Sequence, residues 1–251
     1  MSRHKPTRER VFDDVTLIEN SSDHDAVVRR IPIVATGATV TLWLRLMVWN
    51  MGNASNARVL ADLIRLARHA DVIMLQEAGD RAWVFRAFAI THPWWKLYRP
   101  NAHDGQAATP ELRRRKWPLA RAYSVPALGR RKPHTTDGGK PKFHNVLELF
   151  APGTRRKDRH RAPDVACINV HMVTHGAGPH AYDEQFAALC DLLEHCPAKV
   201  KATGGDLNSV PSAPRLSALR KVTTGWHSHP THGRGDALDQ VLTFEAKGSG
   251  R

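Results

Sequence analysis

Cysteine is scarce in this chain: Cys167, Cys190 and Cys196 are the only three among 251 residues. Their number is odd and no two of them form a CxxC pair, so the sequence indicates neither a disulfide framework nor a cysteine zinc site. No hydrophobic run reaches the roughly 18 residues of a membrane-spanning helix, and the basic N-terminus lacks the apolar stretch of a signal peptide. We therefore expect a cytoplasmic protein without a membrane span.

Acidic residues are also few relative to basic ones. The 24 Asp and Glu against 37 Lys and Arg leave a net charge of +13, and residues 99–161 alone hold sixteen Lys or Arg and five Asp or Glu. This excess favours a polyanionic partner, either nucleic acid or an anionic lipid surface. A solvated loop without a partner is the alternative. The residues predicted to bind nucleic acid are Arg113, Arg114, Arg115, Lys116, Arg130, Arg131 and Lys132.

Hydrophobic periodicity predicts alternating strands and helices. Alternating apolar residues predict a strand over 40–48, helical spacing predicts a helix over 53–69, and a short apolar run predicts a buried strand over 71–75. A chain of this length with 41% hydrophobic residues can form one α/β domain. Further strands are expected at 145–150, 164–171, 199–204 and 237–244, and a further helix at about 180–195.

Polar side chains follow several of these predicted strands. Taken singly, an Asp or Asn after a strand is most often a turn residue. Hydrolysis of a phosphodiester, however, needs a metal ion, a group that positions water and donors to the phosphoryl oxygens, and carboxylate and amide oxygens suit Mg²⁺. The candidates for such a site are Asn50, Glu77, His171, Asp206, Asn208 and Asp239.

Five motifs together resemble those of the endonuclease/exonuclease/phosphatase superfamily, the deoxyribonuclease I-like and exonuclease III-like enzymes. The resemblance implies a deoxyribonuclease I-like α/β (α+β) fold, a four-layer α/β/β/α sandwich of two mixed sheets. It covers most of residues 12–33 and 40–244. The motifs, which match in order and approximate spacing, are Trp49-Asn50, Gln76-Glu77, Asn169-Val170-His171, Gly205-Asp206-Leu207-Asn208 and Leu238-Asp239-Gln240-Val241-Leu242.

The family's closing Ser-Asp-His motif is missing after residue 242, but residues 21–28, SSDHDAVV, look like it. The resemblance therefore implies a circular permutation, with a chance match as the alternative. Residues 12–33 would supply the family's C-terminal motif within a single domain, 1–251, and residues 33–40 would join two strands in a hairpin turning at Gly37. Residues 99–161 would form a basic insertion or loop region.

The resemblance also implies roles for individual residues. Glu77 would be the principal ligand of Mg²⁺, or alternatively of Mn²⁺, with Asn50 and Asp23 helping to hold metal or water.

The remaining implied roles concern acid-base chemistry and the phosphate. Asp206 would orient or deprotonate the attacking water, and Asn208 would contact the phosphate. His171 would donate to a phosphoryl oxygen or the leaving group, while His24 would be oriented by Asp239. We expect the N-terminal segment to pack as a strand beside the strand that contains Asp239. Which histidine is the general acid stays open.

The leading functional prediction is a Mg²⁺-dependent phosphodiesterase that acts as a nuclease on DNA or RNA. The first alternative is a phosphatase or phosphodiesterase with a small-molecule or phospholipid substrate, because one fold and site can serve several substrates. The second alternative is a catalytically inactive nucleic-acid-binding protein. The sequence indicates no protein partner, and we expect a monomer.

Overall fold

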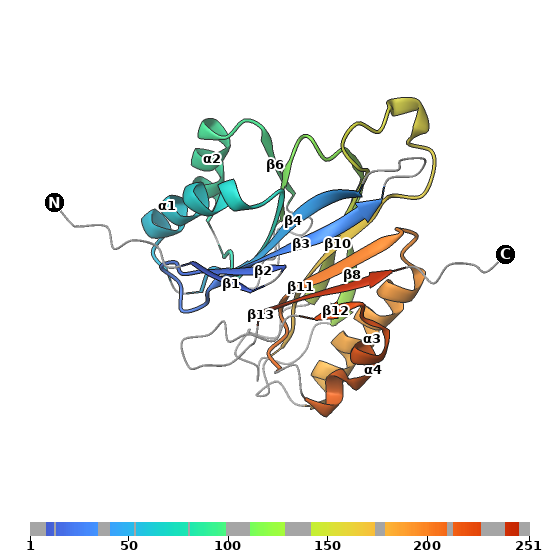
Figure 1. Ribbon diagram of the computed structural model, residues 1–251. Helices are drawn as coiled ribbons and strands as arrows, with labels where there is room; N and C mark the ends of the chain where they lie inside the picture. The colour runs from blue at the N-terminus through green and yellow to red at the C-terminus, as the bar shows by residue number, and fades with distance from the viewer. Residues whose placement is uncertain are drawn as a thin grey trace.

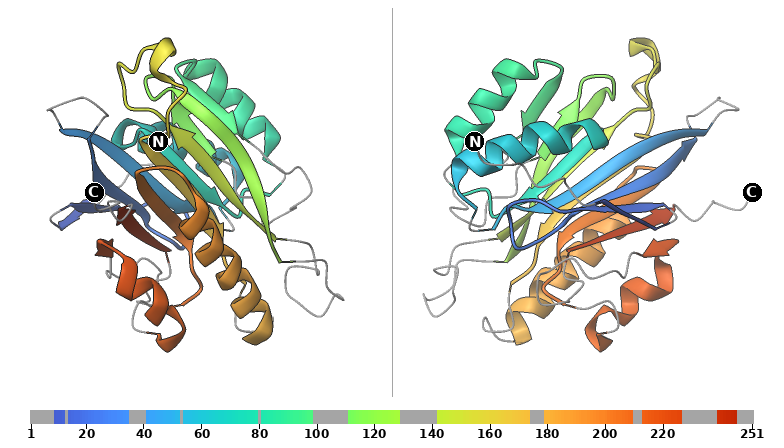
Figure 2. Two further views of the ribbon diagram at one scale, coloured as in Figure 1. Left: turned by 90° about the vertical axis from the view of Figure 1, so that its right-hand side faces the viewer. Right: turned by 60° about the vertical axis from the view of Figure 1, so that its left-hand side comes forward.

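The computed structural model describes residues 9–12, 14–34, 41–52, 54–79, 81–98, 111–128, 142–173, 179–209, 213–226 and 239–245. Within these ranges the chain forms two β-sheets and four α-helices (Figures 1 and 2). No helix among them is both long enough and apolar enough to span a bilayer.

The first sheet has seven strands in the order β1-β2-β3-β4-β5-β7-β6. β4 and β5 are parallel and the other neighbours are antiparallel, so the sheet is mixed. Its strands are β1 (Glu9–Phe12), β2 (Val15–Ile18), β3 (Ala26–Val34), β4 (Thr41–Asn50), β5 (Val72–Gln76), β6 (Trp95–Tyr98) and β7 (Glu111–Arg114).

The second sheet has six strands in the order β12-β13-β11-β10-β9-β8. It is mixed as well, because β10 and β11 are parallel and the other neighbours are antiparallel. Its strands are β8 (Leu119–Leu128), β9 (Lys142–Leu149), β10 (Val165–His171), β11 (Val200–Asp206), β12 (Gly225–Trp226) and β13 (Asp239–Glu245).

The two sheets pack face to face, and helices cover their outer faces (Figure 2). Alternation along the strands sends residues such as Leu46 and Val241 into the core between the sheets. The opposite faces pack against α1 (Asn56–Leu66) and α2 (Ala82–Thr91) on the first sheet, and against α3 (Pro179–His195) and α4 (Ser217–Val222) on the second. This is the predicted four-layer α/β/β/α sandwich.

The described part of residues 99–161 differs from the predicted insertion or loop. It contributes β7, which lies between β5 and β6, and β8 and β9 of the second sheet. Its charged residues are therefore interspersed with strand residues such as Leu112 and Val146 that face the cores.

β3 and β4 form the expected antiparallel pair, with register from Val27 opposite Val48 to Val34 opposite Thr41. The connection that would turn at Gly37 lies outside the described residues.

Candidate active site

Three neighbouring strands of the second sheet bring three of the predicted residues side by side. His171 ends β10 directly opposite Asp206 at the end of β11, and Asp206 lies directly opposite Asp239 at the start of β13. Asp206 and Asp239 are buried, and His171 is nearly so. The strand register therefore aligns an imidazole and two carboxylates along one edge of this sheet.

The facing edge of the first sheet supplies Asn50 and Glu77. Asn50 lies opposite Gln76 in the parallel β4–β5 pair, and Glu77 follows immediately with a left-handed backbone conformation, φ 52°. Such a conformation is uncommon for a residue other than glycine and is concentrated at functional sites. The fully buried Asn50 amide donates to Glu77 Oε1 and to Asp206 Oδ2, both at 3.2 Å, and so connects the two sheets.

The turn before β3 inserts Ser22, Asp23 and His24 beside this edge. Ser22 Oγ donates a hydrogen bond to the carbonyl oxygen of Asn50 at 2.8 Å. Gly52 packs against the turn, and a Cβ atom there would lie 2.5 Å from Asp23 Oδ1. Since Gly52 also has φ +47°, the backbone conformation favours glycine at this position.

His24 and Asp239 form a buried pair, with His24 Nδ1 at 2.5 Å from Asp239 Oδ2. Burial opposes protonation of the imidazole, but the hydrogen bond and negative charge of Asp239 outweigh it and raise the pKa of His24 to about 9.

The predicted contact between His24 and Asp239 is present. The predicted packing of the N-terminal strand beside the strand that contains Asp239 was wrong. The strand after His24 is β3 of the first sheet, so it does not lie beside β13 in one sheet. It faces β13 across the inter-sheet core, where Arg29 Nη1 donates to the carbonyl oxygen of Val241 at 3.0 Å.

Asp206 lies among other negative groups. Burial, followed by the charge of Asp239 and more weakly that of Glu77, raises the pKa of Asp206 to about 7, whereas His24 and the backbone N–H of Asn208 oppose the rise. That N–H donates to Asp206 Oδ1 at 2.7 Å. The net effect favours the protonated form of Asp206 relative to an exposed carboxyl group.

The donor set fits a divalent cation. Ligand atoms of Glu77, His171 and Asp206 all lie within 4.8 Å of one another, and so do those of His24, Asp206 and Asp239. Each group contains two carboxylates that repel each other, and a divalent cation would relieve that repulsion. Carboxylate oxygens are ligands that Mg²⁺ and Mn²⁺ favour. The Glu77 side chain is 35% exposed, which leaves the site open to solvent.

Comparison with known proteins shows the family of the chain. Residues 47–247 match the model of the Endonuclease/Exonuclease/phosphatase family. The chain belongs to this family. Its members hydrolyse phosphate esters and generally use a divalent metal. The match begins after the turn that carries His24, so that turn lies outside it. A search of curated proteins gave no match.

Solved structures share the fold at low sequence identity. An endonuclease/exonuclease/phosphatase from Bacteroides vulgatus superposes with a TM-score of 0.58 at 10% identity, over 80% of this chain and 87% of that one. Truncated TDP2 of Caenorhabditis elegans gives 0.57 at 17%, over 81% and 84%. A mannosyl-6-phosphatase of Bacteroides thetaiotaomicron gives 0.57 at 14%, over 79% and 84%.

Two other predicted residues, Asn208 and Asp23, lie at the edge of the candidate site. Asn208 has φ 45°, and its side-chain amide donates to the carbonyl oxygen of Met172 at 2.7 Å, which holds it next to Asp206. The Asp23 side chain is 55% exposed, with Oδ1 at 4.0 Å from His24 Nε2. Asp23 therefore lies at the solvent rim of the site.

The described members of the predicted basic cluster do not reach this site. Arg113 lies opposite Val72, the first residue of β5, whereas Glu77 follows the last. At about 3.3 Å per strand residue, roughly 16 Å of strand separate the two ends. Arg113 is also buried and donates to the Trp117 carbonyl oxygen and, at 2.8 Å, to Tyr98 Oη. These contacts leave it unsuited to bind phosphate.

The other members of the cluster lie at the same far end of the sheet or outside the described residues. Arg114 and Lys116 lie 3.9 and 2.9 Å from the buried carboxylate of Asp71, and Arg115 is exposed. Arg130, Arg131 and Lys132 lie outside the described residues.

Sequence reasoning missed Arg81, which shapes the loop before α1. Its Nη2 donates to the carbonyl oxygens of Gly52 and Ala54 at 2.9 and 3.0 Å. The one signal in the sequence is a basic residue four positions after Glu77.

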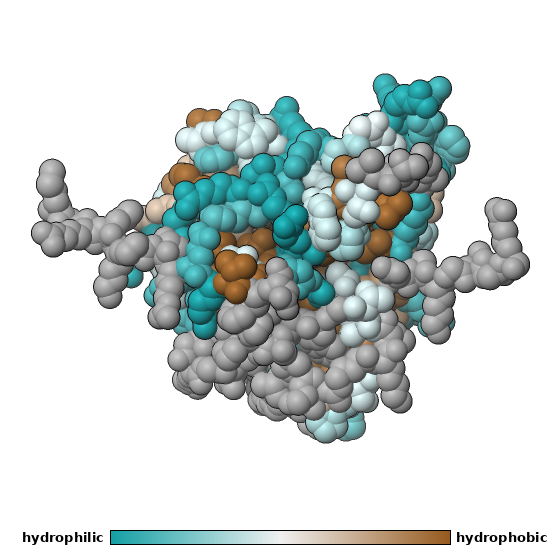
Figure 3. Space-filling model, viewed as in Figure 1, coloured by the Kyte–Doolittle hydropathy of each residue, from teal (hydrophilic) through white to brown (hydrophobic). Residues whose placement is uncertain are grey.

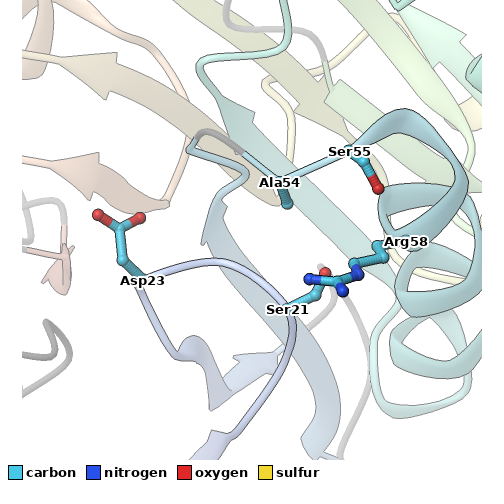
Figure 4. Close-up of a pocket in the computed structure, with 5 residues that line it drawn as sticks. All are labelled: Ser21, Asp23, Ala54, Ser55 and Arg58. Carbon is cyan, nitrogen blue, oxygen red and sulfur yellow. The ribbon is translucent and has the colours of Figure 1, made fainter.

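A pocket of about 520 Å³ beside this loop was missed as well; Ser21, Asp23, Ala54, Ser55 and Arg58 line it. Figure 4 shows the Arg58 guanidinium reaching from α1 toward Ser21, while Asp23 points away from both. The pocket therefore extends from the rim of the site along the start of α1.

Proposed function

We propose that the protein is a Mg²⁺- or Mn²⁺-dependent phosphodiesterase that cleaves nucleic acid. The observation that supports this most directly is the convergence of Glu77, His171 and Asp206 within 4.8 Å, next to the His24–Asp239 pair. Carboxylates and two imidazoles at one solvent-open edge match the needs of phosphoryl transfer to water.

In this proposal Glu77 is the principal metal ligand and Asn50 supports it. The hydrogen bond from the Asn50 amide fixes the Glu77 carboxylate, and Asp23 approaches from the rim. A bound divalent cation supplies charge stabilisation for the phosphoryl oxygens.

Asp206 orients and deprotonates the attacking water. Burial and the neighbouring carboxylates raise the pKa of Asp206, which makes it a stronger base than an exposed aspartate. His24 is held protonated by Asp239 and donates a hydrogen bond to a phosphoryl oxygen. His171 donates to the leaving group or to a second oxygen, and Asn208 contacts the phosphate from the end of β11.

We further infer that Ser22, Asp23 and His24 are the family's closing motif, moved by circular permutation. Three observations support this inference: the family match starts only at residue 47, β3 pairs antiparallel with β4, and His24 meets Asp239 inside the site.

The substrate class rests on charge. The net charge of +13 favours a polyanion as substrate. Arg58 also lines the pocket that Asp23 lines. A small phosphate ester is the second candidate, because the predicted Arg113–Lys116 cluster lies away from the site and one fold neighbour is a mannosyl-6-phosphatase.

The deciding experiment incubates the full chain with plasmid DNA, structured RNA, a phospholipid and a generic chromogenic diester, each with Mg²⁺, Mn²⁺ or EDTA. Metal-dependent cleavage of nucleic acid, lost in Asp206→Asn, is the expected result. Cleavage of only the small diester or the phospholipid would favour the second candidate. Equal cleavage with EDTA, or no cleavage of any substrate, would refute the proposed activity.

A further inference from the structure

The outer side of α2 exposes large apolar side chains. Trp83, Ile90 and Trp94 are 48%, 77% and 52% exposed. Trp83 and Ile90 are seven positions apart on α2, which places them on one side of the helix. Trp94 follows the helix, and its ring lies 5.2 Å from that of His92, which stacks on Phe88 at 4.5 Å. We call these three residues the α2 apolar face.

Packing within the domain does not account for this face. The opposite side of α2 already contributes the buried Val84 and Phe85 to the core beneath it. A helix that is apolar on both sides is normally buried, and a grouped apolar surface on a soluble domain usually marks an interaction site. Figure 3 shows brown and near-white atoms beside teal ones over α2, at the upper left of the molecule.

The segment that carries the α2 apolar face contains charged residues of one sign. Residues 81–98 contain Arg81, Arg86 and Lys96 and no Asp or Glu. The exposed Arg115 adjoins this segment, since its backbone N–H donates to the carbonyl oxygen of Trp94 at 2.9 Å.

Further basic side chains lie beyond Arg115 at the far end of the first sheet. Arg45, Arg114 and Lys116 surround the single buried carboxylate of Asp71, which leaves an excess of positive charge.

We propose that the α2 apolar face docks on an anionic phospholipid membrane surface. Trp residues settle at the boundary between headgroups and acyl chains, a large aliphatic side chain enters the acyl region, and neighbouring Arg and Lys attract anionic headgroups. Nucleic acid would use stacking, for which the most exposed member, Ile90, offers no ring. The basic residues of this segment disfavour a second copy of the same face, because like charges would meet.

This docking surface is separate from the proposed active site. α2 begins at Ala82, after the Glu77 loop, and extends to the far end of the first sheet, where Trp94 meets Arg115. Membrane docking through this face therefore does not depend on which phosphate ester the site hydrolyses.

Co-sedimentation of the full chain with vesicles tests the proposal. Vesicles of phosphatidylcholine mixed with phosphatidylserine should bind the protein, salt should weaken binding, and vesicles of phosphatidylcholine alone should bind far less. Each buried CH₂ group strengthens lipid binding about fourfold. Replacing all three residues (Trp83→Gln, Ile90→Gln, Trp94→Gln) should therefore weaken binding at least about tenfold.

Trp43→Gln is the matched control, because Trp43 is 48% exposed but lies on β4, and it should bind vesicles like the parent. Circular dichroism and hydrolysis of the chromogenic diester should confirm that the triple variant is folded. Absence of binding to anionic vesicles would overturn the proposal, as would equal binding by parent and triple variant. Loss of DNA binding or of a dimer in the triple variant, without any vesicle binding by the parent, would assign the face to nucleic acid or to a second copy instead.

Discussion

Replacing Asp239 with asparagine should release the proton that His24 holds. In the parent protein the pKa of His24 rises from an ordinary 6.5 to about 9, chiefly because the Asp239 carboxylate outweighs the effect of burial. At about 1.4 kcal/mol per pKa unit, the protonated imidazole gains roughly 3 kcal/mol. In Asp239→Asn the burial remains while only the weaker effects of Asp206 and Asp23 oppose it, so the pKa of His24 should fall well below 9.

The same shift predicts how stability depends on pH. Because the folded-state pKa of His24 is raised, its contribution is fully present below about pH 6.5 and is lost as the pH rises through about 9. The stability difference between parent and Asp239→Asn should therefore shrink across this window.

NMR titration of the histidine ring signals in the metal-free protein measures the pKa directly, with His24→Gln to assign the signal. Urea unfolding at several pH values measures the stability difference. A His24 signal that titrates near pH 6.5 in the parent, or one unchanged in Asp239→Asn, would refute the reasoning.

Three further predictions concern other positions. Glu77→Gln should lower phosphodiesterase activity at least about a hundredfold while the fold persists, because transition-state charge stabilisation is lost. Glu111→Gln should become increasingly stable relative to the parent as the pH rises above about 5. Burial raises the pKa of Glu111 well above 4.5, so only the unfolded parent chain ionises in this range. The parent's free energy of unfolding then falls by about 1.4 kcal/mol per pH unit. Gly205→Ala should cost about 3 kcal/mol or more, because its Cβ would lie 1.8 Å from the Val170 carbonyl oxygen at φ +144°.

Matched variants control these measurements. Glu194→Gln removes an exposed carboxylate on α3 and should leave both activity and the pH dependence of unfolding unchanged. Gly153→Ala also has a positive φ, +85°, but its Cβ would meet nothing within 4 Å, so it should cost only about 1 kcal/mol of backbone strain. Parent-like activity in Glu77→Gln, an unchanged pH slope in Glu111→Gln, or equal costs for the two glycine variants would contradict the respective prediction.

The sequence predicted strands such as β4, β5, β10 and β11 because their hydrophobic patterns are local, whereas α2 and β6 to β8 were not predicted. A strand shows its buried face as alternation, and the polar residue that follows it, such as Asn50 or Asp206, is then placed at a sheet edge by the strand itself.

A local sequence pattern does not show which strands pair with one another. Some predictions that depended on strand pairing were wrong. The run that includes Arg113 reads as a charged surface, yet its antiparallel register with β5 places it at the far end of the sheet and buries Arg113. Similarly, the contact of His24 with Asp239 followed from family resemblance, but whether it lies within one sheet or between two depends on tertiary packing.

The 215 positions that separate His24 from Asp239 also bear on when this pair can form during synthesis. The ribosome makes the Ser22–His24 turn early, whereas its carboxylate partner emerges only with β13, which must then pair with β11. Closing so long a loop is entropically costly, so this contact is expected to form late in folding. A nascent or prematurely ended chain would carry the histidine without its carboxylate, and the complete acid-base pair would belong to the finished protein alone.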